Sequence, residues 1–137
     1  MAVLSKSATS LRIFGDNLEP TEITKLLGKE PDRAYRKGDE VPVANGTTRV
    51  ARTGSWSVSV DRKSPGDLDA QITEILDGTS EDLGHWRYLA SRFQVEMFCG
   101  LFLEEWNEGL SVSAATSTLL GSRGISLELD VYCHGEN

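Results

Sequence analysis

Hydrophobic and polar residues alternate along several stretches of the chain, which is the pattern of β-strands with one buried face. The pattern predicts four strands, at residues 9–15, 49–61, 93–103 and 125–133. The second of these fits either a strand or a bent hairpin arm, and the third carries hydrophobic residues on both faces. The last is the most regular and predicts one buried side, formed by Ile125, Leu127, Leu129, Val131 and Cys133.

The first helix is predicted between the first two strands. Proline suits a first helical turn and glycine suits a left-handed residue after the last turn, so Pro20 and Gly28 bound a helix over residues 20–27. Residues 29–48 contain prolines and glycines without hydrophobic periodicity. They are predicted to form a long irregular connection, and connections of that length are often functional.

Three further helices follow from hydrophobic residues at helical spacing. Two lie within residues 67–91, the second of them capped by Ser80. Another begins after Ser111 or Ser113 and ends at Gly121. The predicted order is therefore β-α-β, a helix pair, and β-α-β.

This order predicts an α+β fold of one domain, residues 1–137, with a ferredoxin-like sheet of four antiparallel strands and the helices on one face. Each half consists of a strand, a short helix stopped by glycine, and a second strand. An internal duplication of residues 9–61 and 93–133 is therefore a hypothesis, in which the helix pair 67–91 is an insertion.

Composition and charge narrow the function classes. With 39% hydrophobic and 26% charged residues the chain fits a folded globular protein, and no apolar stretch is long enough to span a membrane. Residues 25–63 hold nine basic and five acidic side chains, whereas residues 64–137 hold three basic and thirteen acidic ones. We expect no nucleic-acid binding, because an acidic surface repels phosphates. The acidic surface favours solubility or a basic partner.

Short motifs along the chain resemble a bacterial family catalogued as domain of unknown function 4279. They run from Leu11-Arg12-Ile13-Phe14-Gly15 through Leu18-Glu19-Pro20-Thr21-Glu22-Ile23, Leu27-Gly28, Pro31, Lys37-Gly38-Asp39 and Ser55-Trp56-Ser57-Val58 to Ile125-Ser126-Leu127-Glu128-Leu129-Asp130-Val131-Tyr132. The resemblance implies a stand-alone bacterial cytoplasmic domain of unassigned function and brings no catalytic residue or cofactor. By analogy, one form of such a function is that of an immunity protein that neutralises a toxin.

No metal or catalytic constellation is predicted. Asp130 and His134 would point to one face of a strand and Cys133 to the other, so they cannot share an ion. Cys99 and Cys133 are expected to be reduced core residues, in a chain without a signal peptide. Trp106 lies among glutamates, where its ring either folds back onto the protein, as we expect, or meets a partner.

The face of the sheet opposite the core is the leading candidate site. Its predicted aromatic and acidic members are Phe14, Phe98, Phe102, Asp130 and Tyr132. A sheet face exposed to solvent does not need this many aromatic rings. We therefore expect a protein partner, a second copy in a homodimer, or the helices of residues 67–91 to cover them. A non-enzymatic interaction domain acting through this face is the leading hypothesis.

The alternative is a small anionic-ligand binder or enzyme that uses the basic loop of residues 29–52. Its candidate anion-binding residues are Arg33, Arg36, Lys37 and Arg49. A deep pocket that unites them with Tyr35 or Trp56 would favour this alternative, whereas a flat apolar face would favour a protein partner.

Overall fold

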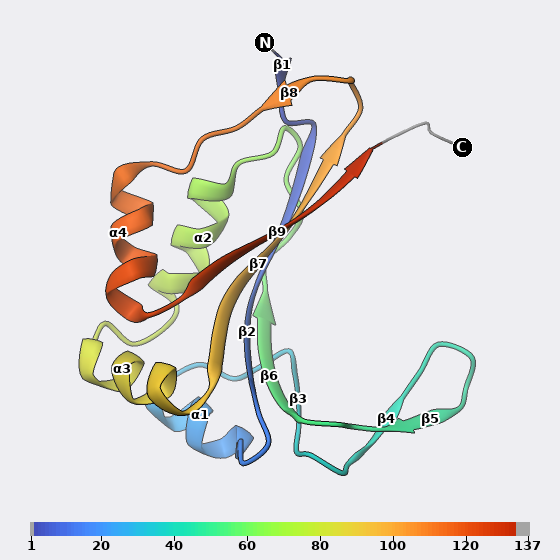
Figure 1. Cartoon of the computed structure of the whole chain (residues 1–137), viewed down its shortest axis with the longest axis vertical. Coiled ribbons are helices and arrows are strands. Elements are labelled where there is room, and N and C mark those ends of the chain that lie inside the picture. The colour runs from blue at the N-terminus through green and yellow to red at the C-terminus, as the bar shows by residue number, and fades with distance from the viewer. Residues whose placement is uncertain (1, 134–137) are drawn as a thin grey trace.

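The computed structural model describes residues 2–133, and its main feature is a five-stranded mixed sheet (Figure 1). In spatial order the strands are β3 (Arg33–Tyr35), β6 (Gly54–Ser59), β2 (Lys6–Gly15), β7 (Gln94–Leu103) and β9 (Ser126–Cys133). The first three pairings are antiparallel and the β7–β9 pairing is parallel.

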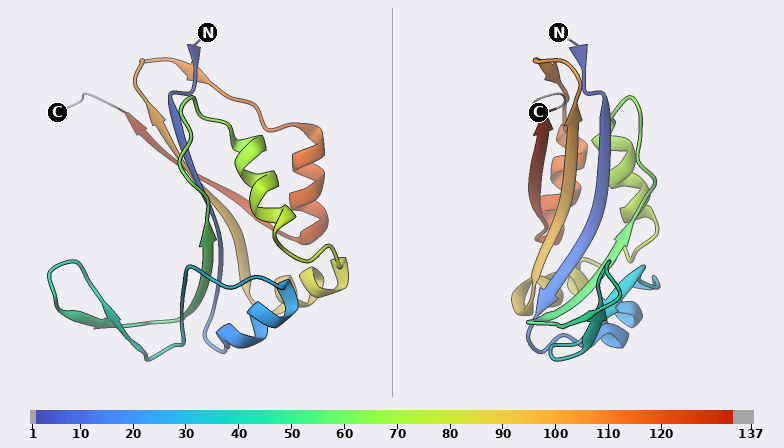
Figure 2. Two further views of the ribbon diagram at one scale, coloured as in Figure 1. Left: turned by 180° about the vertical axis from the view of Figure 1, so that it is seen from behind. Right: turned by 90° about the vertical axis from the view of Figure 1, so that its right-hand side faces the viewer.

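Helices cover one face of this sheet and leave the other open (Figure 2). Within the described residues they are α1 (Pro20–Leu27), α2 (Leu68–Asp77), α3 (Leu83–Arg92) and α4 (Ala114–Arg123). The predicted bounds of α1 are confirmed, with Gly28 in the left-handed conformation after its last turn. Asp82 caps α3 in place of Ser80, and α4 runs past Gly121 to a left-handed Gly124.

The core lies between the sheet and the helices. Its largest fully buried side chains are Trp56 from β6 and Trp86 from α3. The helix pair predicted as an insertion therefore covers the same face as α1 and α4, and the opposite face stays uncovered. Gln71 of α2 is buried in this layer, where its amide group bonds to Ser7 and Thr9 of β2.

An α+β fold is confirmed, but a four-stranded antiparallel ferredoxin-like sheet is not. Helix α4 carries the chain back to the end of the sheet where β7 began, so β9 runs parallel to β7. In the first half, by contrast, β6 pairs antiparallel with β2. The duplication of the two halves stays a prediction.

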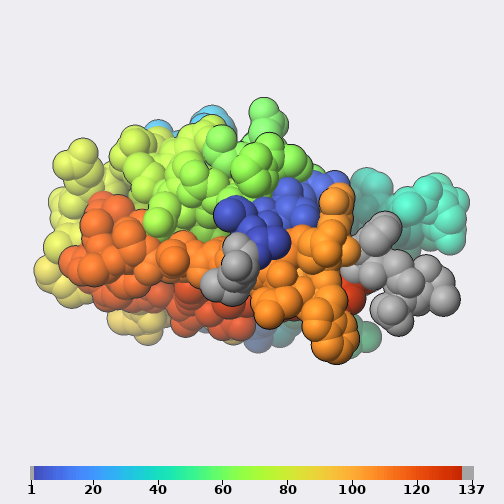
Figure 3. All heavy atoms as spheres, turned by 90° about the horizontal axis from the view of Figure 1, so that it is seen from above, coloured from blue at the N-terminus to red at the C-terminus, as the bar shows by residue number. Residues whose placement is uncertain are grey.

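The predicted irregular connection contains more strand than expected, whereas the predicted strand 49–61 is interrupted at residues 51–53 and ends at Ser59. Residues 33–35 form the edge strand β3, and β4 (Glu40–Pro42) pairs with β5 (Thr48–Val50) as an antiparallel hairpin. This hairpin, called here the arm, projects from the sheet on the side away from the helices (Figure 3). A further short pair joins β1 (Ala2–Val3) to β8 (Glu108–Gly109).

The predicted burial of the last strand is wrong. Ile125 is 6% exposed, but Leu127, Leu129 and Val131 are 36%, 51% and 55% exposed, and Cys133 is also exposed. The reason is position: β9 is an edge strand, and α4 contacts it only sparsely. Cys99, as predicted, is a buried free thiol.

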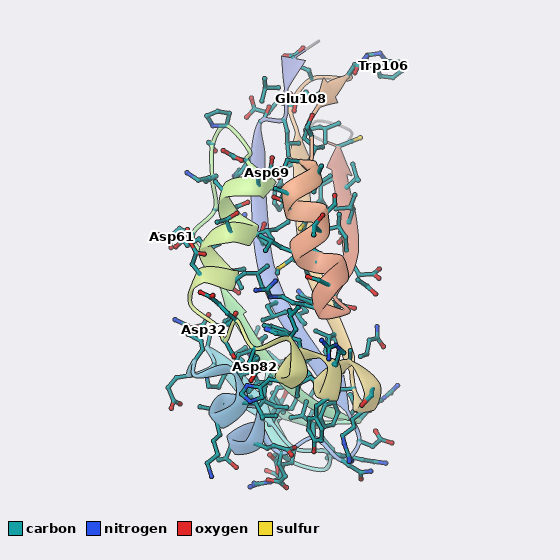
Figure 4. The ribbon with its side chains drawn as sticks, turned by 90° about the vertical axis from the view of Figure 1, so that its left-hand side faces the viewer. Asp32, Asp61, Asp69, Asp82, Trp106 and Glu108 are labelled. Carbon is teal, nitrogen blue, oxygen red and sulfur yellow. The ribbon has the colours of Figure 1, made fainter. Side chains whose placement is uncertain are left out.

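Trp106 does not fold back onto the protein. Its side chain is 97% exposed and points away from the turn that follows β7 (Figure 4). No helix among residues 2–133 is long and apolar enough to cross a membrane.

Candidate binding site on the open sheet face

The open face is built by the alternate residues of the central strands that point away from the helices. Strand β2 contributes Ser10, Arg12 and Phe14, and the register of β6 sets Ser59, Ser57 and Ser55 opposite them. On the other side of β2, Ser10 lies opposite Phe98 of β7. A row of small hydroxyl side chains is thus bordered by arginine and aromatic rings.

Two adjoining hollows cross this face, and together they are called here the open-face groove. One has a volume of about 370 Å³ and the other about 300 Å³, and they share Ser10, Arg12 and Ser59. The first hollow also contains Arg33 and Tyr35 of β3, and the second extends to Tyr132 of β9.

Aromatic rings in the groove are stacked with cations and with each other. The Arg12 guanidinium lies 3.8 Å from the centroid of the Phe98 ring. Phe102 stacks on Tyr132 with centroids 4.9 Å apart, and Arg62 lies 5.0 Å from the Phe102 centroid. Such contacts hold a guanidinium flat on a ring and leave its N–H edge free to donate.

Gly100 makes room for this stacking. It lies on the open face between Phe98 and Phe102, directly opposite Ala8. A Cβ atom at this position would lie 3.3 Å from the Phe102 ring, tighter than ordinary van der Waals contact. The Phe102 ring therefore uses the space that the missing side chain leaves.

The charge of Arg12 is not neutralised within the described residues. Its Nε donates to Ser10 Oγ at 3.3 Å. Glu96, directly opposite on β7, is buried, accepts from Gln94 Nε2 and makes no ion pair with Arg12. Arg33 and Arg62 also lack a carboxylate within 4.0 Å among residues 2–133. The lining of the groove is thus basic, whereas the candidate residues predicted for this face were aromatic and acidic.

The predicted anion-binding set is divided by the structure. Arg36 pairs with Glu19 at 2.8 Å, which raises the pKa of the guanidinium, and Lys37 pairs with Asp16 at 3.3 Å. A hydrogen bond from Thr53 and the pair with Lys37 lower the pKa of Asp16. These two cations are therefore already engaged by carboxylates.

Arg33 and Arg49 instead flank Tyr35 near the arm. Their guanidinium carbons lie 6.0 and 5.9 Å from the ring centroid, and Arg49 Nη2 donates to the Tyr35 hydroxyl at 3.4 Å. Trp56, the other aromatic considered with these arginines, is fully buried in the core. Thus no deep pocket unites the four predicted cations, and Arg12 takes the central place.

The five predicted members of the interaction face do share the open face. Phe98, Phe102 and Tyr132 line one hollow and Phe14 lines the other. Asp130 accepts a hydrogen bond from the Tyr132 hydroxyl, which raises the pKa of that phenol. Arg12 and Arg62 were missed as site residues, and the available signal for Arg12 was its polar position between Leu11 and Ile13 on a strand.

No group of three potential metal-ligating side chains comes together in the described residues, and His134 lies outside them. The absence of a metal stays a prediction. Burial raises the pKa of the Cys99 thiol to about 11, so this cysteine is protonated at neutral pH and is a poor nucleophile.

Comparison with known proteins identifies a family and no function. No curated protein and no solved structure matches the chain. The model of one protein family does match, over residues 5–134. Because this match covers nearly the whole sequence, the chain belongs to that family, which is described as domain of unknown function (DUF4279).

Proposed function

We propose that the protein is a cytoplasmic binding domain whose open-face groove docks an acidic segment of a partner protein. The observation that carries the proposal is Arg12, which is held against the Phe98 ring with its charge unpaired within residues 2–133. A carboxylate can meet the N–H edge of such a guanidinium in bidentate geometry.

The charge distribution supports an acidic partner. The chain carries a net charge of −7, yet Arg12, Arg33 and Arg62 line the groove. A basic groove on an acidic protein orients an acidic partner during approach and rejects other orientations. The serine hydroxyls of β2 and β6 add hydrogen-bond donors along the groove.

The shape of the groove favours an extended chain over a small molecule. Small-molecule sites are enclosed and mainly apolar, with a few polar groups. The open-face groove instead crosses the sheet from β3 to β9, with hydroxyl and guanidinium groups along its walls. Aromatic side chains and arginine are also the residues that dominate the binding energy at protein interfaces.

A small anionic ligand is the second candidate, and the cluster of Arg33, Tyr35 and Arg49 favours it. We do not propose nucleic acid, because its backbone carries a charge at every nucleotide and would place phosphates beside Glu128 and Asp130 on the β9 side of this face, whereas a peptide can confine its carboxylates to the arginine side. A toxin-neutralising role in a bacterial cell is one form that the proposed function can take. No catalytic residue is proposed.

Fluorescence anisotropy with a labelled glutamate-rich peptide tests the proposal. Arg12→Gln should weaken binding of this peptide about tenfold, because charge-assisted hydrogen bonds are worth about 1.5–3 kcal/mol. Arg87→Gln, on the exposed part of α3, is the matched control and should change nothing. An equal loss of peptide affinity in both variants would mean that the peptide is attracted only by the overall charge of the protein, and would reject the groove as its binding site.

Two further measurements distinguish the proposed peptide partner from the alternative ligands. Tripolyphosphate that competes at the same concentration as the peptide would favour the small-ligand candidate, and tighter binding of a single-stranded oligonucleotide would overturn the choice of partner. Sedimentation of the free protein addresses the homodimer: a dimer that Phe98→Asp dissociates without unfolding would show that a second copy occupies the groove.

A further inference from the structure

Strand β9 leaves the long edge of the sheet unpaired. It spans eight residues, Ser126–Cys133, and among residues 2–133 its only neighbour in the sheet is β7 (Figure 2). An edge strand presents a row of unpaired backbone N–H and C=O groups, and proteins normally shorten, cover or charge such an edge. Within the described residues nothing pairs with the outer side of β9.

The side chains of β9 divide into two chemically different rows. On the side that faces the helix layer, Leu127, Leu129 and Val131 are 36%, 51% and 55% exposed. On the open-face side, Glu128 and Asp130 carry negative charge. A strand added to this edge would place its own alternate residues beside these two rows.

Charge makes a second copy of this chain a poor occupant. A two-fold antiparallel pair of β9 strands centred on Leu129 would set Glu128 of one copy opposite Asp130 of the other. A pair centred on Asp130 would set that carboxylate against itself. Like charges directly opposite each other destabilise a strand pair, so these carboxylates oppose self-pairing in both registers.

We infer that the free edge of β9 accepts an added strand from a partner polypeptide whose residues alternate between apolar and basic. Apolar side chains of that strand cover Leu127, Leu129 and Val131, and its lysine or arginine side chains face Glu128 and Asp130. Backbone hydrogen bonds along the edge provide the affinity, and the two side-chain rows select the sequence. This surface meets the groove at Tyr132, but the inference rests on the outer edge of β9 and does not depend on the function proposed for the groove.

A peptide of alternating valine and lysine is the probe, with a peptide of the same composition but grouped valines as its control. The alternating peptide should bind, and it should slow hydrogen exchange of the amides in residues 126–133. The grouped peptide should do neither. Equal binding of both peptides, or binding without protection of β9, would overturn the inference, because either result means attraction without strand addition.

Charge reversal provides the second test. The double variant Glu128→Lys and Asp130→Lys should lose about tenfold in affinity for the valine–lysine peptide and gain affinity for a valine–glutamate peptide, since each reversal replaces an attractive cross-strand charge pair by a repulsive one. The control reverses Glu104 and Glu105, two exposed residues in the turn after β7, with the same change in net charge. An equal effect of the control, or a wild-type dimer that Leu129→Arg dissociates, would reject the proposed partner.

Discussion

The guanidinium of Arg12 lies 3.8 Å from the centroid of Phe98, although the residue directly opposite Arg12 on β7 is Glu96. The cation therefore contacts an aromatic ring on the neighbouring strand in preference to a carboxylate. This arrangement fixes the planar group on the open face and leaves its charge available to a ligand.

The Arg12–Phe98 contact can be measured by a double-mutant cycle. We expect a coupling of about 0.5–1 kcal/mol between Arg12→Ala and Phe98→Leu, the range for a partly exposed cation–π pair. Urea unfolding of the parent, the two single variants and the double variant gives this value. Strictly additive effects would show that the ring does not hold the guanidinium.

Gln71 should be one of the most sensitive polar positions in the core. Its Oε1 accepts from Ser7 Oγ at 2.6 Å and from Thr9 Oγ1 at 2.9 Å, and its Nε2 donates to the carbonyls of Ser7 and Asp61. Gln71→Leu removes the acceptor of the Ser7 and Thr9 hydroxyls and the side-chain donor to the Asp61 carbonyl, while Lys63 N still donates to the Ser7 carbonyl. It should lower the free energy of unfolding by about 2–4 kcal/mol.

Glu74→Leu is the control for Gln71, because Glu74 is exposed on the same helix. Its free energy of unfolding should stay within about 0.5 kcal/mol of the parent, the usual range for surface substitutions. Similar losses for both variants in urea unfolding would show that the helix itself, and not the buried hydrogen bonds, sets the cost.

Stability should fall at alkaline pH because of Cys99. Burial raises the pKa of this thiol from its ordinary value of 9.0 to about 11, so between these two values the unfolded chain loses a proton that the folded chain keeps. The contribution is fully present below pH 9 and is lost as the pH rises toward 11, with a total of at most about 2.7 kcal/mol.

The test for Cys99 compares the parent with Cys99→Ala across this range. Tyrosine and lysine side chains also titrate there, but they do so in both proteins, so the difference between the two unfolding curves isolates the thiol. Parallel pH dependence would contradict the prediction. In the native parent a thiol reagent should label Cys133 quickly, because it is exposed, and Cys99 only after unfolding.

Trp106 should dominate the quenching of tryptophan fluorescence by acrylamide. It is 97% exposed, whereas Trp56 and Trp86 are fully buried. Trp106→Phe should remove the readily quenched component of the emission and leave the free energy of unfolding within about 0.5 kcal/mol of the parent. A readily quenched component that persists in Trp106→Phe would show that one of the two core tryptophans is accessible.

Local sequence signals predicted the helices and strands well. Strand direction and side-chain exposure could not be predicted, because they depend on contacts between residues far apart in the sequence. Pro20 and Gly28 define α1 through backbone conformations that neighbouring residues determine. The direction of β9 depends on the crossover through α4, and the exposure of Leu129 depends on how far the helices reach across the sheet. The alternation of polar and apolar residues along one strand indicates neither the direction of that strand in the sheet nor how far the helices cover it.

The same distinction applies to the candidate site. Alternation placed Phe98 and Phe102 on one face, because side chains of one strand repeat every second residue. Arg36 was expected to be free for an anion, but its carboxylate partner, Glu19, lies 17 positions earlier in the sequence. Arg12 was not among the candidate site residues, because only the three-dimensional packing sets its guanidinium on Phe98 and away from Glu96.

The two edges of the main sheet have very different lengths, with three residues in β3 and eight in β9. Continuous polymerisation by strand addition needs two long complementary edges on every molecule. Among residues 2–133 the main sheet offers one such edge, so copies of this protein cannot join one after another by pairing β3 of one with β9 of the next along its full length. Fibres that continue the main sheet from copy to copy are therefore not expected, even at high protein concentration.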